Sequence, residues 1–278
     1  MGYQCVDCVE AGRRQTRAQA ATYRKSGLGY RTVAGARASS QAIVTPVLIV
    51  INVVVYGITA ALAKDPMNNH LAPVFFDGAL FPLLVADGEW WRLITSGFLH
   101  YGPFHLLMNM LALYLIGRDL ELLLGKTRFL ALYGLSLLGG SAAVFVGSDM
   151  NVATAGASGA VYGMLGGILI AAMRLKLNLT FIIGIIVLNL FLSIQIKQIS
   201  LLGHLGGLIV GIVVTVAMVY APEQRRKPIQ LGTVIGVAAV LLALIVFRDA
   251  QFGDVVCTEF SGGRIGCDVP GVSLPERG

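Results

Sequence analysis

Charged residues are scarce in this chain. They make up 13% of its 278 residues, whereas soluble domains carry about 25%. Hydrophobic residues reach 56% and the mean hydropathy is +0.75, so a water-soluble globule could not bury most of these side chains. The natural solvent for such a chain is a lipid bilayer. The net charge of +6 suits anionic lipid headgroups, and no interleaving of aromatic and basic residues indicates a nucleic-acid partner.

A secretory signal is also lacking at the N-terminus. Residues 1–41 are polar and basic, without an apolar core before a small-residue cleavage site. The first apolar run begins at Ala42 and is long enough to stay in the membrane. This N-terminal segment is therefore predicted to be a basic tail outside the bilayer.

Seven apolar runs approach the roughly 20 residues that cross a bilayer as a helix. They lie at 42–62, 103–122, 128–146, 157–173, 179–194, 202–220 and 230–247. The segment between the first two runs holds short apolar patches and two tryptophans, which favour the membrane interface. The pattern predicts an all-α, polytopic membrane bundle. Its expected parts are the tail 1–41, a six-helix core 42–220, a loop with a seventh span at 221–247, and a polar tail 248–278.

The distribution of Lys and Arg orients these spans. Most of these residues lie in the N-terminal tail and in the loops after spans two, four and six. Because cytoplasmic loops are enriched in Lys and Arg, this pattern predicts a cytoplasmic N-terminus. Seven spans then place the C-terminus on the extracytoplasmic side.

Cysteine is rare, with four residues. Cys257 and Cys267 lie ten apart on the side predicted to be oxidising, where a disulfide is possible. Cys5 and Cys8 form a CxxC pair on the reducing side, which is only half of the four ligands of a structural zinc site. The sequence therefore assigns no metal and no cofactor.

Spans two, four and six each carry unusual polar residues near the end predicted to face outward. These are His105 and Asn109 in span two, Ser158 in span four and His204 in span six. Polar side chains within a membrane are costly, so they are candidates for function. Taken singly, Ser158 could be a helix cap, His204 a packing or proton-relay residue, and His105 and Asn109 partners of a neighbouring helix.

Glycines at every fourth position predict how spans four and six meet. The two stripes are Gly159, Gly163 and Gly167 in span four, and Gly203, Gly207 and Gly211 in span six. Small-residue stripes allow two helices to pack backbone against backbone. If the stripes face each other, Ser158 and His204 lie at the same height. This is the arrangement that a serine nucleophile and its histidine base require.

These residues resemble the motifs of the rhomboid intramembrane serine proteases. The matching segments are GASGAVYG at 156–163, GHLGGLIVG at 203–211, His100-x-x-x-x-His105 followed by Asn109, Gly117-x-x-x-Glu121-x-x-x-Gly125, and Trp91-Arg92. The resemblance covers about residues 42–220, in the family's order. The N-terminal segment Tyr3-Gln4-Cys5-x-x-Cys8 looks like the end of a small zinc-binding module that precedes the core in some bacterial members.

The resemblance implies a role for each matching residue. Ser158 would be the nucleophile and His204 its base, without an aspartate. Tyr162 would stack on His204, while His105, Asn109 and the Ser158 N–H would hold the oxyanion. Gly156 would keep the approach to the serine open.

Other motif residues are expected to be structural. Trp91 and Arg92 would shape the outer loop, and Glu121 would set the packing of span two. Gly207 and Gly211 belong to the glycine stripe described above.

The expected activity is endoproteolysis of transmembrane or juxtamembrane segments of membrane proteins, in a bacterial plasma membrane. One alternative is an inactive rhomboid-like protein that binds membrane proteins and shields or routes them, although such relatives usually lose the serine or the histidine. Another is a transporter with His105 and His204 as proton carriers, which would need ionisable groups across the whole bilayer. The sequence does not specify the substrate, the cleavage motif or the oligomeric state.

Overall fold

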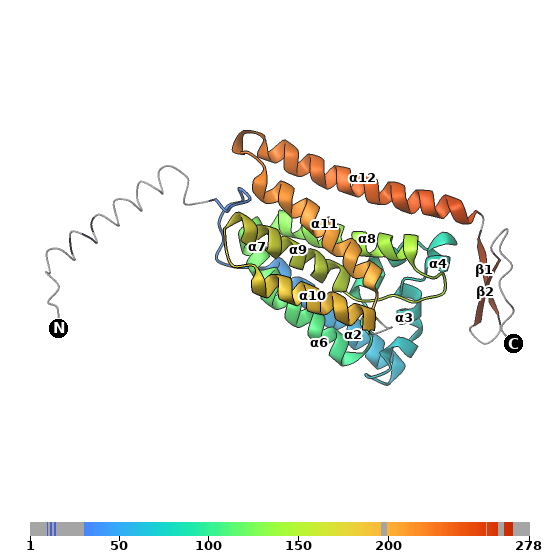
Figure 1. Cartoon of the computed structure of the whole chain (residues 1–278). Helices are drawn as coiled ribbons and strands as arrows, with labels where there is room; N and C mark the ends of the chain where they lie inside the picture. Colours follow the sequence, from blue (N-terminus) through green and yellow to red (C-terminus); the bar gives the residue numbers. More distant parts are fainter. Residues whose placement is uncertain are drawn as a thin grey trace.

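The computed structural model describes residues 31–195, 199–253, 255–260 and 264–268, together with residues 10, 12 and 14. Cys5 and Cys8, the partial zinc motif, lie outside the described residues. The described chain forms a bundle of helices followed by one short hairpin (Figure 1).

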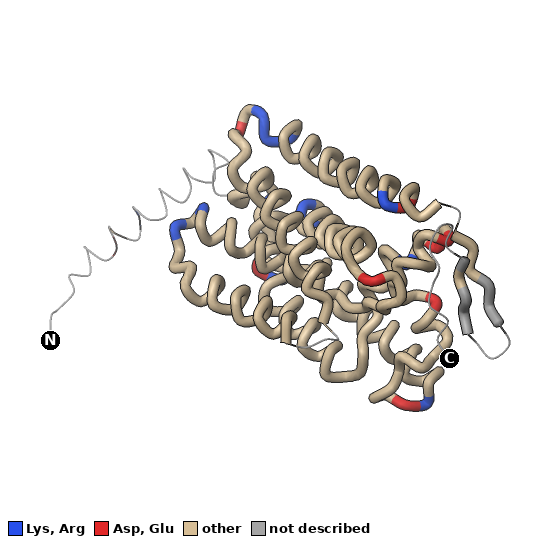
Figure 2. The backbone as a smooth tube through the Cα atoms, turned by 45° about the vertical axis from the view of Figure 1, so that its right-hand side comes forward, with Lys and Arg blue, Asp and Glu red and all other residues tan. Residues whose placement is uncertain are grey.

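Helices cover all seven predicted spans. They are α2 (Val44–Ala63), α6 (Gly102–Ala112), which continues through a π-helical turn (Leu113–Gly117) into α7 (Arg118–Leu124), then α8 (Lys126–Gly147), α9 (Ser158–Arg174), α10 (Thr180–Gln195), α11 (Leu201–Tyr220) and α12 (Arg226–Phe252). Helices α2, α8, α11 and the segment Glu223–Phe252 are long and apolar enough to cross a membrane, and α9 and α10 are shorter apolar helices. In Figure 2, α12 carries charge only near its two ends. The predicted class, a multi-pass helical bundle with a seventh C-terminal span, is confirmed.

Glycines let three helices meet at the centre of the bundle. A Cβ added to Gly207 of α11 would lie 2.0 Å from the carbonyl oxygen of Gly159 in α9, and one added to Gly211 would lie 2.1 Å from that of Gly163. The stripes of α9 and α11 thus face each other. Helix α8 joins them in the same way, since a Cβ on Gly206 would lie 2.3 Å from the Gly139 carbonyl oxygen. Only residues without a side chain allow this approach.

Replacing Gly207 by alanine is therefore expected to lower the free energy of unfolding by about 3 kcal/mol, because the new methyl group meets backbone that cannot yield. Gly236→Ala is the matched control. It lies in the interior of α12 with nothing within 4 Å of the added Cβ, so it should leave stability unchanged or raise it by about 0.5–1 kcal/mol. Thermal unfolding in detergent measures both, and equal melting temperatures would contradict the close packing.

The segment between the first two spans folds into short helices. They are η2 (Asn69–Leu71), α3 (Pro73–Gly78), α4 (Pro82–Ala86), α5 (Arg92–Thr95) and η3 (Ser96–Phe98). Arg92 is buried, donates to the carbonyl oxygens of Phe76 and Ala79, and pairs with Glu89. Trp91 donates its indole N–H to the Asp77 carbonyl oxygen at 3.1 Å. Arg92 therefore ties α3 to α5, which is consistent with the structural role expected for this pair.

Glu121 of α7 caps the first span. Its carboxylate accepts the backbone N–H groups of Ile43, Val44 and Thr45 at 2.7–2.9 Å, together with the Thr45 hydroxyl at 2.9 Å. The first N–H groups of a helix have no partner within the helix, and its N-terminus carries a partial positive charge. A buried carboxylate at this place satisfies both, so Glu121 joins α7 to the start of α2.

Glu121→Gln is expected to lower the free energy of unfolding by about 2 kcal/mol, because an amide offers one acceptor oxygen and turns its NH₂ towards donors. Asp119→Asn, on the exposed side of the same helix, removes the same charge without these contacts and should have little effect. Melting temperatures of the two variants test this, and equal values would argue against the capping role.

The chain beyond the core departs from the sequence prediction in two respects. Helix α12 continues to Phe252, where Phe252 packs on Phe145 of α8 with ring centroids 5.8 Å apart. A hairpin follows, with β1 (Val256–Phe260) antiparallel to β2 (Arg264–Asp268), in what the sequence suggested was only a polar tail. Cys257 and Cys267 lie directly opposite in its register and form a disulfide.

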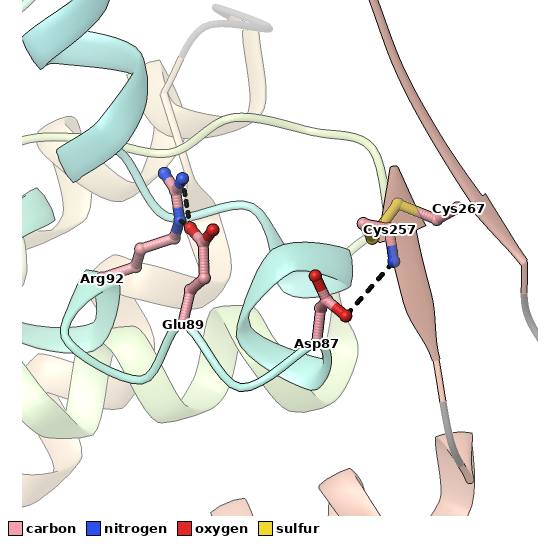
Figure 3. Close-up of a disulfide and its surroundings, with 5 residues drawn as sticks. All are labelled: Asp87, Glu89, Arg92, Cys257 and Cys267. Atoms are coloured by element: carbon pink, nitrogen blue, oxygen red, sulfur yellow. Dashed lines mark hydrogen bonds and ion pairs between the residues drawn. A yellow bond between two sulfur atoms is a disulfide. The ribbon is translucent and has the colours of Figure 1, made fainter. Parts of the chain in front are cut away.

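The hairpin contacts the segment between the first two spans. The Cys257 N–H donates to Asp87 at the end of α4, at 3.2 Å (Figure 3). Figure 3 also shows the Arg92–Glu89 pair in the same loop. The C-terminal hairpin therefore lies at the same end of the bundle as the segment between the first two spans.

Candidate functional site

Ser158 is the first residue of α9, and the residues just before it are held in place by backbone hydrogen bonds. The Gly156 N–H donates to the Ser96 carbonyl oxygen, and Thr154 and Leu80 exchange two backbone hydrogen bonds, all at 2.9 Å. Gly156 has a φ of +138°, a conformation that residues with a side chain rarely adopt. The residues just before Ser158 are thus held against the segment between the first two spans, and residue 156 has no side chain.

His105 of α6 lies against Gly156. A Cβ added to Gly156 would lie 3.0 Å from His105 Nε2 and 3.7 Å from Ser158 Oγ, so both side chains border the same glycine. The Tyr101 N–H donates to His105 Nδ1 at 3.2 Å, which makes Nδ1 the acceptor. The neutral ring then carries its proton on Nε2, which lies against Gly156. His105 is therefore arranged as a hydrogen-bond donor beside the serine.

Two other residues of this region support His105. Asn109 is buried one turn along α6 and donates one amide hydrogen to the His105 carbonyl oxygen at 3.0 Å, which leaves its second hydrogen available. His100 precedes α6, and its ring centroid lies 5.2 Å from that of His105. Burial, with a smaller effect of His105, lowers the pKa of His100 to about 3, so this ring is neutral at physiological pH.

His204 of α11 is buried against Tyr162 of α9. The two rings stack at 3.8 Å between centroids with an interplanar angle of 14°. Tyr162 lies one helical turn after Ser158, and the neighbours of the two candidate residues, Gly159 and Gly203, pack on each other. Ser158 and His204 therefore lie at the same height on facing helices.

No hydrogen bond among the described residues joins Ser158 to His204. A contact between a nucleophile and its base is often long in a structure without substrate and tightens when substrate binds.

Ser193 of α10 is a member of this group that sequence reasoning missed. Its Oγ lies 2.7 Å from His204 Nδ1, and the residue is 5% exposed. The available signal was a polar pair four residues apart, Asn189 and Ser193, within an otherwise apolar span. Such a pair is a weak signal of function, because a serine can satisfy its hydrogen bond within its own helix.

A small cavity of about 30 Å³ borders Ser158. Its walls come from the segment between the first two spans, from residues 154–156 and from α8, α9 and α11. Its hydroxyl-bearing residues are Ser96, Ser141, Thr154, Ser158 and Ser200. A pocket with several hydroxyls can hold water, because each ordered water needs two to four polar partners. The serine therefore borders a polar space, although the surrounding helices are apolar.

Glu121 lies at the opposite end of span two from His105, where it caps α2. Among the described residues, the polar groups of the candidate site gather near one end of the bundle and do not form a path through it. This arrangement does not fit the proton-carrier alternative, which requires ionisable groups across the whole bilayer.

The fold and this cluster describe a multi-pass helical membrane protein with a polar site near one end of its bundle. A family model described as the Rhomboid domain matches residues 87–221. Rhomboid protease GluP of Bacillus subtilis (strain 168) is 42% identical over 146 residues, which cover 51% of this chain and 28% of GluP.

Two further relatives are covered over most of their length. Putative rhomboid protease YdcA of Bacillus subtilis (strain 168) is 35% identical over 150 residues, 52% of this chain and 75% of the relative. Rhomboid protease AarA of Providencia stuartii is 30% identical over 234 residues, 73% of this chain and 81% of the relative. The chain belongs to the rhomboid family, in which several relatives are named as proteases.

Proposed function

We propose that this protein is an intramembrane serine endopeptidase that cuts transmembrane or juxtamembrane segments of other membrane proteins. The observation that carries the proposal is the convergence on Ser158. His105 Nε2 and Ser158 Oγ border the same glycine, and His204 is stacked on Tyr162, one turn along α9 from the serine. This arrangement supports roles for Ser158 as the nucleophile, His204 as its base and His105 as a donor to the oxyanion, each from a different helix.

In the proposed reaction, Ser158 Oγ attacks the scissile carbonyl and His204 accepts its proton. His204 then protonates the leaving amine, and a water molecule releases the acyl group by the same steps in reverse order. The His105 Nε2–H, the second amide hydrogen of Asn109 and the Ser158 N–H stabilise the negative charge on the carbonyl oxygen. The cavity beside Ser158 supplies a polar space for the water.

Substrate access is proposed to occur beside α10. This helix lies on the outside of the bundle (Figure 1) and its buried residues are Ile186 and Ser193. A substrate helix must unwind before its backbone can reach Ser158, because its carbonyl groups are already hydrogen-bonded within the helix. Segments with helix-weakening residues such as glycine or proline are the expected substrates.

The site is proposed to lie near the extracytoplasmic face of a bacterial plasma membrane, with residues 42–220 as the catalytic unit and α12 as an accessory helix. The support is the excess of Lys and Arg at the end of the bundle opposite Ser158. Fusions of a periplasmic and a cytoplasmic reporter to residue 253 test the orientation. Periplasmic activity alone is expected, and cytoplasmic activity alone would reverse the assignment.

A fluorophosphonate probe tests the proposed nucleophile directly. Such a probe reacts with activated serines, so it should label the purified wild-type protein in detergent and fail to label Ser158→Ala. His204→Ala should lose labelling as well, because the serine then lacks its base. Equal labelling of wild type and Ser158→Ala would show that another residue reacts and would end the assignment.

A further inference from the structure

Ser193 contacts the second ring nitrogen of His204, the one that the proposed reaction does not use as a base. Its hydroxyl donates to the Asn189 carbonyl oxygen at 2.8 Å, so its lone pairs are directed elsewhere. One of them faces His204 Nδ1 at 2.7 Å, and the Tyr162 hydroxyl lies 3.4 Å from the same oxygen. An oxygen that has already donated its hydrogen accepts one from Nδ1, and the proton of the neutral His204 ring is then on Nδ1. This leaves the Nε2 lone pair free to act as the base.

We propose that Ser193 is a positioning residue that fixes the tautomer and orientation of His204, and that it makes the alignment of the base depend on α10. The inference rests on the proposed protease function. A residue that orients a catalytic imidazole through its second nitrogen commonly sets the competent tautomer. Here that residue belongs to α10, whose buried residues are Ser193 and Ile186. Movement of α10 away from α9 and α11 would therefore remove the acceptor from His204.

The test compares Ser193→Thr with Ser193→Val, because the two side chains have the same shape and differ in the hydroxyl. Ser193→Thr is expected to stay within about threefold of wild type, whereas Ser193→Val should lower kcat about tenfold with little change in KM, in keeping with the loss of one hydrogen bond. Equal kcat values for the Thr and Val variants, at equal melting temperatures, would overturn the role of the hydroxyl.

A small probe separates alignment of the base from substrate entry. A fluorophosphonate is small, so it can reach the serine without the bundle opening to admit a substrate helix. The rate of probe labelling should therefore fall in Ser193→Val by the same factor as the rate of cleavage. Loss of cleavage with unchanged labelling would mean that Ser193 acts on substrate entry and would overturn the proposal. If Ser158→Ala were also labelled, the proposed function itself would fail, so the two failures are distinguishable.

A second, independent observation concerns three arginines at the other end of the bundle. They surround the turn at Ala34–Gly35, which precedes α2. Arg31 donates to the Gly35 carbonyl oxygen at 3.3 Å, and Arg226, at the start of α12, lies against Gly35 so closely that a Cβ there would meet its guanidinium. Arg128 of α8 donates to the Gln230 side chain at 2.7 Å, and Gln230 in turn donates to the Ala34 carbonyl oxygen at 3.0 Å.

This arginine cluster, Arg31, Arg128 and Arg226, has more positive charge than its described surroundings balance. The charges of Arg31 and Arg226 both act repulsively on Arg128. The described ion pair of the cluster is a 3.7 Å contact from Arg226 to Glu223, an exposed residue. Arg226 Nε is buried and has no hydrogen-bond partner among the described residues. Buried donors of this kind normally have a hydrogen-bond partner, so this N–H can donate to a further ligand.

We infer that the arginine cluster binds the phosphate group of an anionic phospholipid headgroup. Its three members come from the segment before α2 and from the ends of α8 and α12, beside the apolar spans, which is headgroup level for a lipid. Guanidinium groups bind phosphate oxygens through paired N–H donors. A basic pocket between transmembrane helices is a site where lipid phosphates bind. A bound headgroup would join the N-terminal segment, the core and α12.

The full chain in detergent is titrated with phosphatidylglycerol, phosphatidylcholine or inorganic phosphate while its melting temperature is measured. Phosphatidylglycerol should raise the melting temperature of wild type more than phosphatidylcholine. Arg31→Gln and Arg226→Gln should weaken the apparent affinity about tenfold. Lys227→Gln, which removes the same charge from the exposed neighbour of Arg226, should not. Arg31 is exposed, so its variant stays informative if Arg226→Gln does not fold.

The outcomes separate the possible sources of phosphate. A shift with phosphatidylglycerol but not with inorganic phosphate supports the lipid site. An equal shift in melting temperature with inorganic phosphate would mean that the site binds a free anion, and it would overturn the headgroup assignment. Absence of both shifts, or equal weakening by Lys227→Gln, would overturn the site, because the effect would then be absent or would reflect general surface charge.

Discussion

Ser158→Ala and His204→Ala are each expected to lower kcat for a transmembrane substrate about 10⁴-fold or more, because either change removes the nucleophile or its activation. The two residues act as one unit, so the double variant should be no slower than either single variant. The measurement is cleavage of a fluorescent transmembrane substrate by purified protein in detergent.

Ser148→Ala, a serine at the end of α8 outside the site, is the control and should cleave at the wild-type rate. Cleavage by Ser158→Ala at the wild-type rate would rule out the protease mechanism built on this residue. Loss of cleavage in both single variants, followed by a further large loss in the double variant, would mean that the serine and histidine act separately. Binding of a substrate helix without cleavage by wild type would favour the inactive, membrane-protein-binding alternative.

His105→Ala is expected to lower kcat about 10²–10³-fold with a small change in KM, the usual effect of removing one oxyanion donor. The reason is geometric. The Tyr101 N–H occupies Nδ1, which leaves the Nε2–H on the side of Gly156 and Ser158. A donor that contacts the oxygen only after it becomes charged affects kcat more than substrate binding.

His70→Ala, at an exposed position between the first two spans, is the matched control and should retain full activity. Steady-state kinetics of both variants decide the matter. An unchanged kcat in His105→Ala would remove this residue from the oxyanion site. A rise in KM with unchanged kcat would instead place it in ordinary substrate binding.

Much of the fold could be predicted because a membrane helix is specified by consecutive residues of the chain. Twenty apolar residues in a row specify a span without reference to the rest of the chain. The four-residue spacing of the glycines also predicted which faces of α9 and α11 meet. The contribution of Gly139 and Gly206 was harder to predict, since helix α8 has many small residues and spacing alone does not identify their partners.

The contacts of Glu121 and Ser193 show where local patterns stop being sufficient. Glu121 caps a helix that begins 77 residues earlier in the chain, so its partners are known only after α2 and α7 are placed side by side. Ser193 looks like a serine that satisfies itself within its helix, and it does donate to the Asn189 carbonyl oxygen. Its second contact, to His204, exists only because α10 packs beside α11.

The sequence by itself determined the membrane class, the number of spans and the polar residues of the candidate site, because each of these depends on residue type and spacing along one helix. The tertiary structure decided which atoms face one another. It directed His105 Nε2 towards the glycine beside Ser158, placed Ser193 behind His204, and gathered three arginines around one turn. Those relations depend on distances between helices far apart in the chain, which packing fixes and a linear pattern does not contain.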